Sequence, residues 1–327
     1  EILKVDQCTC SFGKAVDSLF KKLQLKKFRS REMEGAPCMS VTRECTWTKK
    51  PAIEQGIDGT WLSPEIVKKR EASQNEIAGE HYKEMGDLAG EKGEQWAAVI
   101  HIDGNGMGDN IHYLVKDTDF GTGIRRIREF SIQIQKIYEN AYNEMKKECA
   151  VRIKGQDEKL LRKYKEEGKP PFRKIYGAGD DLTFICYGPL AIPAAEIFLQ
   201  KLQKIKCIVD SFGIIKMSAC AGIAFMKPGY PFSKAYELAE RCCVAAKQKA
   251  RTEAGVTGEG MGSYIDFQLL YGGLQNLGAL RMETERLGAT YGWRFYMRPY
   301  KVTDNHNSGK LSVFYAVSDW IQNSGIA

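Results

Sequence analysis

Three stretches in the middle of the chain have the pattern of β-strands. An apolar run ends in Asp103 and passes into a glycine-bearing loop, which predicts a buried strand at residues 97–103. Residues 174–188, KIYGAGDDLTFICYG, place two runs of β-branched and aromatic residues on either side of a glycine-bearing turn, which predicts a β-hairpin. The segment MSACAGIAF, residues 217–225, is also strand-like.

Helical periodicity separates these strands. It predicts one helix within residues 122–149, a second at residues 191–212 and a third at residues 233–251, with Ser233 as the N-cap of the third. The resulting order of strand, helix, hairpin, helix, strand and helix is the βαββαβ arrangement of ferredoxin-like folds. We therefore expect an α+β fold in which the first strand and the hairpin are neighbours in one sheet.

The central domain of this fold is expected to span residues 96–262. Residues 1–95 would form an N-terminal accessory region, and residues 263–327 would form a C-terminal accessory region that packs on the central domain. The C-terminal region starts with a helix-like segment, YIDFQLLYGGL, at residues 264–274. Residues 79–93 are polar and punctuated by glycine, which predicts a loop before the first strand.

The composition narrows the class of protein. The chain has 327 residues, of which 43% are hydrophobic, and no uninterrupted apolar segment reaches membrane-spanning length, so we expect a soluble, cytoplasmic protein with no membrane partner. The formal net charge of +7 suits a nucleotide or another polyanion, although the excess is small for this length. Several of the ten cysteines lie in apolar contexts of predicted core elements, where reduced structural thiols are expected.

Four cysteines in the N-terminal region raise the alternative of a zinc site. Cys8, Cys10, Cys38 and Cys45 could supply four thiolate ligands. Neither pair has the spacing that is common in structural zinc sites. Zinc is therefore an alternative that the spacing disfavours.

Three aspartates define the candidate chemistry. Asp103 stands at the carboxyl end of the first predicted strand, and Asp180 and Asp181 stand at the tip of the hairpin. Adjacent carboxylates repel each other unless a cation neutralises them, and hard oxygen ligands suit Mg²⁺ or Mn²⁺. Because neighbouring strands would bring the three together, the pattern predicts a pair of divalent ions that binds a nucleoside triphosphate. An ordinary hairpin with two solvated aspartates is the alternative.

The loop after Asp103 contains three glycines, Gly104, Gly106 and Gly108. Glycine lets backbone N–H groups approach an anion closely, so this loop is a candidate phosphate cradle. It lacks the spacing and the following helix of a dinucleotide-binding fingerprint. A plain turn is the alternative interpretation.

These motifs together resemble a known family. The chain is similar to the palm domain of the polymerase and cyclase family that includes GGDEF diguanylate cyclases and, more closely, the second palm domain of the large subunit of type III CRISPR complexes and the minimal CRISPR polymerases. The CRISPR branch has a GGDD turn, here AGDD at residues 178–181, and an Asp-Gly-Asn/Asp-x-Met-Gly loop, here DGNGMG at residues 103–108. AGIAF, AERCCVAAK and SYIDFQLL match later elements. Ala178 replaces the first glycine of the turn, and Asp181 favours the CRISPR branch over the GGDEF pattern.

The resemblance implies roles for individual residues. Asp103, Asp180 and Asp181 would be catalytic and would hold two Mg²⁺ or Mn²⁺ ions, with the backbone carbonyl of Gly104 completing the coordination. Lys247 would neutralise charge on the triphosphate. The nucleotide would also contact Gly104, Asn105, Gly106, Met107, Gly108, Ala178 and Gly179.

The resemblance also implies the reaction. Such an enzyme would convert ATP to a cyclic di- or oligonucleotide second messenger in CRISPR-like antiviral defence. It would work as a homodimer or with a partner palm, and it could assemble with CRISPR-type subunits. A catalytically silent, nucleotide-binding palm scaffold is the alternative; a template-directed polymerase is disfavoured because no long basic, aromatic-interleaved tract is found. The four histidines, His81, His101, His112 and His306, form no His-Asp pair, so an HD nuclease is not expected.

Overall fold

The computed structural model describes most of the central part of the chain. The described residues are 12–30, 43–75, 82, 85–89, 96–153, 170–208, 214–258, 260–270, 281, 286, 290, 292, 297–303, 311 and 314–316. The chain divides into two compact units. One comprises Glu1–Glu80 with Lys116–Phe120, and the other comprises His81–Val115 with Gly121–Ala327.

The described residues of the first unit form two helices and a short antiparallel ladder. The elements are α1 (Phe12–Ser30), β1 (Glu54–Gln55), β2 (Trp61–Leu62) and α2 (Pro64–Asn75). β1 pairs with β2 in antiparallel register, and Leu62 of β2 is buried. None of the helices among the described residues of either unit is long and apolar enough to cross a membrane.

The second unit is built on a six-stranded sheet in the order β10-β9-β8-β3-β5-β4. Its strands are β3 (Ala97–Gly104), β4 (Phe172–Ala178), β5 (Asp181–Tyr187), β8 (Ala219–Met226), β9 (Tyr264–Leu269) and β10 (Tyr300–Lys301). β8 and β9 run parallel, whereas the other neighbours are antiparallel. The central strand, β3, therefore lies between the hairpin strand β5 and β8.

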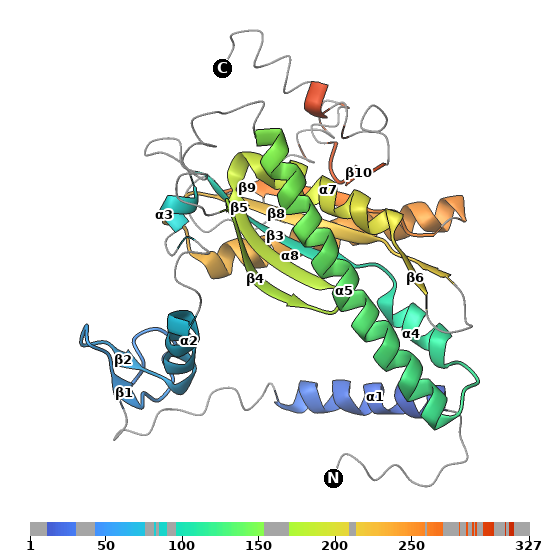
Figure 1. The fold of residues 1–327 in the computed structure, drawn as a ribbon, viewed down its shortest axis with the longest axis horizontal. Coiled ribbons are helices and arrows are strands. Elements are labelled where there is room, and N and C mark those ends of the chain that lie inside the picture. The colour runs from blue at the N-terminus through green and yellow to red at the C-terminus, as the bar shows by residue number, and fades with distance from the viewer. Residues whose placement is uncertain are drawn as a thin grey trace. The chain divides into compact units, whose positions relative to one another are not determined.

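Helices cover both faces of this sheet. α5 (Phe120–Ile153) and α7 (Ala191–Lys204) lie on one face, and α8 (Phe232–Thr257) lies on the other (Figure 1). The remaining elements are α3 (Met85–Leu88), α4 (Met107–Val115), η2 (Gly188–Leu190), β6 (Lys206–Ile208) and β7 (Ile214–Lys216). The order β3, α5, β4, β5, α7, β8 is βαββαβ, so the predicted α+β, ferredoxin-like fold is confirmed.

The side chains of β3 alternate between two hydrophobic cores. Ile100 and Ile102 point into the larger core with residues of α5 and α7. Ala97 and Val99 point into the smaller core, where they meet α8. This alternation follows from the period of two in a strand, and it explains why β3 reads as a continuous apolar run.

α8 packs against the sheet with its backbone at Gly222 of β8. A Cβ atom at Gly222 would lie 1.9 Å from the carbonyl oxygen of Ala239 and 2.3 Å from the nitrogen of Cys243. Only glycine leaves room for so close an approach. The contact therefore fixes the position of α8, and with it the part of the helix that follows Cys243.

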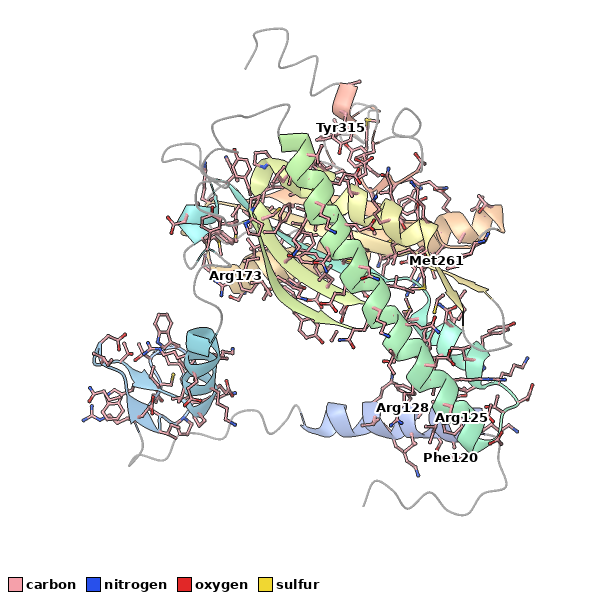
Figure 2. The ribbon with its side chains drawn as sticks, in the orientation of Figure 1. Phe120, Arg125, Arg128, Arg173, Met261 and Tyr315 are labelled. Carbon is pink, nitrogen blue, oxygen red and sulfur yellow. The ribbon has the colours of Figure 1, made fainter. Side chains whose placement is uncertain are left out.

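Contacts also tie C-terminal residues to α7. Tyr315, labelled in Figure 2, donates a hydrogen bond from its hydroxyl to Oε2 of Glu196 at 2.8 Å. Gln200 donates from Nε2 to the carbonyl oxygen of Thr303 at 3.0 Å. Because Glu196 and Gln200 are both buried, these bonds satisfy polar groups that would otherwise be costly.

The structure corrects several expected elements and boundaries. α5 extends beyond the expected range of 122–149 at both ends, and α3 lies in the segment 79–93 that was expected to be a loop. α7 ends at Lys204 rather than at residue 212, and the chain continues into the β6 and β7 ladder. α8 begins at Phe232 with Pro231 as its N-cap, so Ser233 lies within the first turn, and the helix continues to Thr257. Helix ends depend on capping geometry that periodicity does not specify.

The segment expected to be helix-like at residues 264–274 contains a strand. Tyr264–Leu269 forms β9, which pairs in parallel with β8, and its first four residues are buried. The periodicity of a short apolar run is compatible with both a buried strand and a helix. Here the pairing with β8 makes the segment a strand. The sheet therefore includes β9 and β10, which follow residue 262.

Candidate active site

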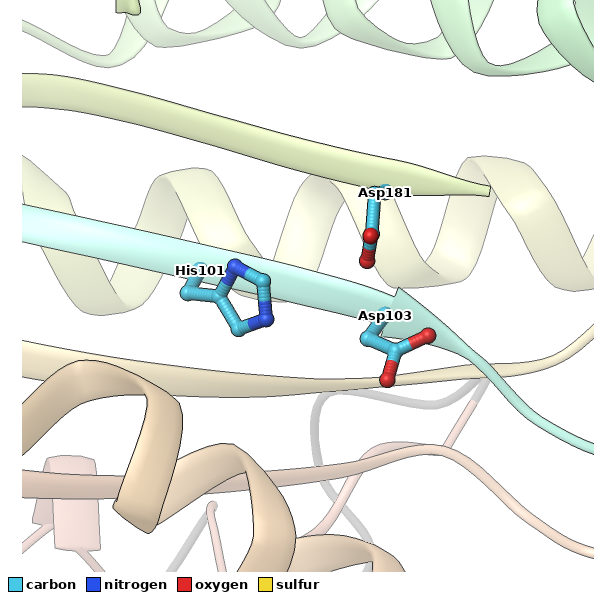
Figure 3. A group of neighbouring side chains, drawn as sticks. All are labelled: His101, Asp103 and Asp181. Atoms are coloured by element: carbon cyan, nitrogen blue, oxygen red, sulfur yellow. The ribbon is translucent and has the colours of Figure 1, made fainter. Parts of the chain in front are cut away.

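The register of β3 and β5 brings two of the predicted aspartates together. Asp103 is directly opposite Asp181, and His101 is directly opposite Thr183. Residues two apart on a strand share a face, so all four side chains lie on the same face of the sheet, the one that α8 covers. Ligand atoms of His101, Asp103 and Asp181 all lie within 4.8 Å of one another (Figure 3).

Asp180 lies in the hairpin turn beside this group. Gly179 precedes it with φ of +62°, as the first position of a two-residue hairpin turn requires. The backbone N–H of Gly104 donates to the carbonyl oxygen of Asp180 at 3.3 Å. A Cβ atom at Gly104 would lie 2.8 Å from Oδ2 of Asp180, so glycine at this position lets the carboxylate approach β3. Asp180 is not part of the group of three ligand atoms that includes Asp181.

Lys247 of α8 contacts two of the groups that were predicted to bind a metal ion. Its Nζ lies 2.5 Å from Oδ2 of Asp103 and donates to the carbonyl oxygen of Gly104 at 2.7 Å. The side chain of Lys247 is 17% exposed and that of Asp103 is 34% exposed, so solvent screens the pair only in part. One ammonium group faces three carboxylates, which leaves this corner of the sheet negatively charged.

Burial and mutual repulsion act on the hairpin carboxylates. Burial raises the pKa of Asp180, and the negative charges of Asp103 and Asp181 add to the effect. Burial also raises the pKa of Asp181, with a further contribution from Asp103. Both shifts mean that the negatively charged state is unfavourable without a nearby cation. A bound divalent ion would relieve that cost.

The loop after Asp103 is anchored by Asn105. Its backbone N–H donates to the carbonyl oxygen of Ser218 at 2.9 Å, and its side-chain Nδ2 donates to Oγ of Ser218 at 3.1 Å and to the carbonyl oxygen of Gly262 at 3.0 Å. Asn105 is buried, so these bonds hold the loop against the ends of β8 and β9. Gly106 follows with φ of +66°, close to Met261, which is labelled in Figure 2.

A helix follows the loop directly, contrary to the sequence-based expectation. α4 begins at Met107, and Gly108 lies in its first turn. The first backbone N–H groups of a helix have no partner within the helix, and they favour an anion. The apolar residues Met107, Ile111 and Leu114 have helical spacing, which is the signal that could have indicated α4, although Gly108 weakens it.

A pocket lies on the other face of the sheet, between α5 and the hairpin. Its lining includes Gln135, Tyr138 and Glu139 from α5, and Lys174 and Ala178 from β4. Gly177, Gly179 and Asp181 also line it, so the pocket reaches the edge of the carboxylate group. Ala178, which also lines the pocket, is an exposed residue.

Tyr138 has an unusual environment in this pocket. The residue is 4% exposed, and its hydroxyl has no hydrogen-bond partner among the described residues. Burial raises the pKa of Tyr138 well above its usual value, and Asp180 and Asp103 add to the shift. A buried phenol without a partner is costly, and a polar ligand group would satisfy it.

Two candidate residues, His101 and Tyr138, are not indicated by the sequence patterns above. His101 could have been identified from its position two residues before Asp103 on the same strand, because residues at that spacing share a face. Tyr138 gives no such signal, since a tyrosine at helical spacing usually fills a core.

None of the cysteines among the described residues belongs to a group of three or more potential metal ligands. Seven of them are described as free and buried: Cys45, Cys149, Cys186, Cys207, Cys220, Cys242 and Cys243. Cys8, Cys10 and Cys38 of the alternative zinc site lie outside the described residues. Burial raises the pKa of Cys242 to about 12, as expected for a structural thiol.

The sheet order and the carboxylates at neighbouring strand ends define a palm-type α+β domain. Residues 96–254 of this chain match the family model described as Cas10/Cmr2, second palm domain. The resemblance that the AGDD and DGNGMG motifs predict is therefore confirmed. A search of curated proteins finds no match to the chain.

Several solved structures show a remote similarity. Diguanylate cyclase SiaD in complex with its activator SiaC from Pseudomonas aeruginosa is 9% identical, with a TM-score of 0.34, over 78% of this chain and 70% of that chain. The GGDEF domain of DgcB from Caulobacter crescentus in complex with c-di-GMP is 11% identical, with a TM-score of 0.31, over 53% of this chain and 77% of that chain. A Csm1-Csm4 cassette in complex with pppApA is 13% identical, with a TM-score of 0.36, over 72% of this chain and 30% of that chain.

Proposed function

We propose that this chain is a nucleotidyltransferase of the nucleotide cyclase or polymerase type, and specifically a cyclase that converts ATP to a cyclic di- or oligonucleotide. The observation that carries the proposal is the pairing of Asp103 with Asp181 across β3 and β5, within the segment that matches the Cas10/Cmr2 second palm domain. Carboxylates that converge from separate segments of the chain are what a catalytic cluster requires.

The donor set fits Mg²⁺ or Mn²⁺. Asp103, Asp180 and Asp181 supply carboxylate oxygens, and Gly104 supplies a backbone carbonyl oxygen next to them. These are the hard oxygen ligands that such ions prefer. When bound, two ions would lower the pKa of an attacking 3′-hydroxyl and stabilise the charge on the leaving pyrophosphate.

Lys247 would have two roles in turn. Without nucleotide, its ammonium group neutralises Asp103 and binds the carbonyl oxygen of Gly104. A metal ion would compete for both groups, and the ammonium, on its flexible stem, would then be free to bind the triphosphate. The N-terminus of α4, which begins at Met107, would offer backbone N–H groups to the same phosphates.

The pocket between α5 and the hairpin would hold the nucleoside. It adjoins Asp181, and the hydroxyl of Tyr138 and the side chain of Gln135 offer polar atoms there. The preference for ATP and a role in CRISPR-like antiviral defence are supported by the motif resemblance and the family match alone. A homodimer or a partner palm would bring two triphosphates face to face, and CRISPR-type subunits are the proposed wider partners.

The test is to incubate the full chain with each labelled nucleoside triphosphate and Mg²⁺ or Mn²⁺, and to resolve the products by mass. We expect release of pyrophosphate and a cyclic oligoadenylate from ATP. The matched controls are Asp103→Asn and Asp181→Asn, which remove a carboxylate but keep its size. Consumption of GTP alone would overturn the substrate assignment, and equal product from the parent and both variants would overturn the site.

A second candidate function is a catalytically silent palm that binds nucleotide within a larger assembly. Two observations favour it: Lys247 contacts two of the predicted metal ligands, Asp103 and Gly104, and Ala178 replaces a glycine at the turn. It predicts saturable ATP binding by isothermal titration calorimetry with no product in the assay above. The variant Ala178→Gly tests whether the turn is the cause. If Ala178→Gly forms product and the parent does not, the alanine in the turn accounts for the missing activity.

A further inference from the structure

His101 is a buried polar residue whose presence the proposed reaction does not explain. It is 7% exposed and lies in the middle of β3, on the face that α8 covers. A neutral apolar residue would pack there as well, as Val99 does two positions earlier on the same face. The imidazole instead lies beside Asp103 and Asp181, with a ligand atom within 4.8 Å of an oxygen of each.

The ring of His101 is held on two sides. Nδ1 lies 3.0 Å from Oγ1 of Thr183, the residue directly opposite on β5. Tyr236 of α8 packs edge-on against the ring, with 5.6 Å between the ring centroids. When Nδ1 carries the proton and donates to Thr183, the lone pair of the imidazole is on Nε2. Figure 3 shows a ring nitrogen of His101 on the side that faces Asp103.

This arrangement matches the environment of a metal-binding histidine. Such a histidine usually donates its other ring N–H to a nearby oxygen, which fixes the tautomer and the orientation of the ring. Thr183 supplies that oxygen here, while Asp103 and Asp181 each place a carboxylate oxygen within 4.8 Å of a ligand atom of the imidazole.

We propose that Nε2 of His101, together with the carboxylates of Asp103 and Asp181, binds one of the divalent ions. The inference rests on the proposed function for the presence of an ion at this corner. It adds a nitrogen ligand to an oxygen set, and imidazole suits transition ions, whereas Mg²⁺ favours oxygen ligands and water. The site should therefore prefer Mn²⁺ or Co²⁺ to Mg²⁺.

The decisive measurement is pulsed electron paramagnetic resonance of the full chain loaded with Mn²⁺. We expect ¹⁴N modulation from a directly bound imidazole in the parent and none in His101→Leu or His101→Asn. His101→Asn keeps a polar group opposite Thr183, so it remains informative if the leucine variant folds poorly. His112→Gln, which removes an exposed histidine of α4, is the matched control and should keep the signal.

Affinity gives a second readout. His101→Asn should weaken Mn²⁺ binding about tenfold or more, the loss typical when a metal site loses a supporting group, and should change Mg²⁺ binding by less than about threefold. Equal losses for both ions would overturn the proposal. So would Mn²⁺ that binds without nitrogen modulation, modulation that persists in both His101 variants, or a parent that binds no Mn²⁺.

These outcomes separate the inference from the proposed function. Mn²⁺ bound without nitrogen coupling, in a protein that still forms product, contradicts only the role of His101. Nitrogen coupling in a protein that makes no product from any triphosphate contradicts the reaction and leaves the ligand assignment in place.

Discussion

The two faces of the central sheet differ in the size and polarity of what they bury. The face under α5 and α7 packs large apolar side chains, such as Phe184, Phe198 and Leu199, into one continuous core. The face under α8 is lined mainly by small residues of the helix, among them Ala235 and Ala239. Small residues let α8 approach closely enough for polar side chains to meet across the gap.

This difference in packing goes with the position of the proposed catalytic residues, which lie on one face of the sheet. The same strands, β3 and β5, supply apolar residues to the α5 side and His101, Asp103 and Asp181 to the α8 side. On the α8 side, Lys247 lies one helical turn after Cys243, whose backbone is close to Gly222, and its ammonium group contacts Asp103. The α5 side holds the larger core, with the proposed nucleoside pocket beside the hairpin, and the α8 side carries the proposed metal ligands and Lys247.

The largest expected effect is on catalysis. Asp181→Asn should lower product formation by about a thousandfold, because it removes a charged group from the centre of the site while keeping the fold. Product yield and the unfolding midpoint should be measured together. Asp117→Asn is the control, because Asp117 is exposed and its φ of +56° is tolerated by asparagine. A loss of similar size in the control would show that the effect is not specific to the site.

The second prediction tests the close contact of α8. Gly222→Ala should lower the free energy of unfolding by about 3 kcal/mol, since its Cβ would overlap backbone atoms of α8 that cannot move alone. Gly255→Ala is the matched control, because a Cβ at that helical position meets nothing within 4 Å. There we expect a gain of about 0.5 to 1 kcal/mol. Urea denaturation measures both, and equal stability of the two variants would contradict the packing argument.

The third prediction concerns Lys247. Lys247→Ala should weaken triphosphate binding by about 1.5 to 3 kcal/mol, for ATP and GTP alike, because a charge-assisted contact is lost whatever the base. Without nucleotide the same variant should bind Mn²⁺ more tightly than the parent, because the ammonium no longer competes for Asp103. Calorimetry measures both affinities.

The exposed Arg251 of α8 provides the control for this pair of measurements. Arg251→Ala should change neither affinity appreciably. Weaker Mn²⁺ binding in Lys247→Ala would show that the ammonium supports the metal site rather than competing for it.

The smallest expected effect is on stability as a function of pH. The pKa values of Asp180 and Asp181 are higher in the folded state than in the unfolded chain. At pH values between the unfolded and the folded pKa, the native protein therefore binds more protons than the unfolded chain. Stability without metal should therefore fall as pH rises through the raised pKa values.

Asp180→Asn removes one of these groups and should flatten that profile. At neutral pH the variant should be as stable as the parent or more stable by up to about 1 kcal/mol, a value that allows for solvent screening. Denaturation at several pH values between 4 and 8, roughly the range in which such groups titrate, provides the measurement. Parallel profiles for parent and variant would contradict the prediction.

Much of this architecture can be predicted from local pattern. The run of apolar residues in β3, the hairpin around Gly179 and the helical spacing within α8 are each properties of a short segment, and each forms as expected. The end of β3 and the tip of the hairpin meet because neighbouring strands share an edge, so the convergence of Asp103 with Asp181 also follows from the order of elements.

The rest depends on long-range contacts that no local pattern contains. β9 is a strand because it pairs with β8. His101 belongs to the candidate site because the register of β3 and β5 places it opposite Thr183, and Lys247 binds Asp103 because Gly222 lets α8 approach. The sequence by itself determined that β3, the two hairpin strands and β8 become strands and where the carboxylates gather, since both follow from residue period and element order. Only the tertiary structure decided which additional side chains meet those carboxylates, because that choice is made by register and by helix packing between residues far apart in the chain.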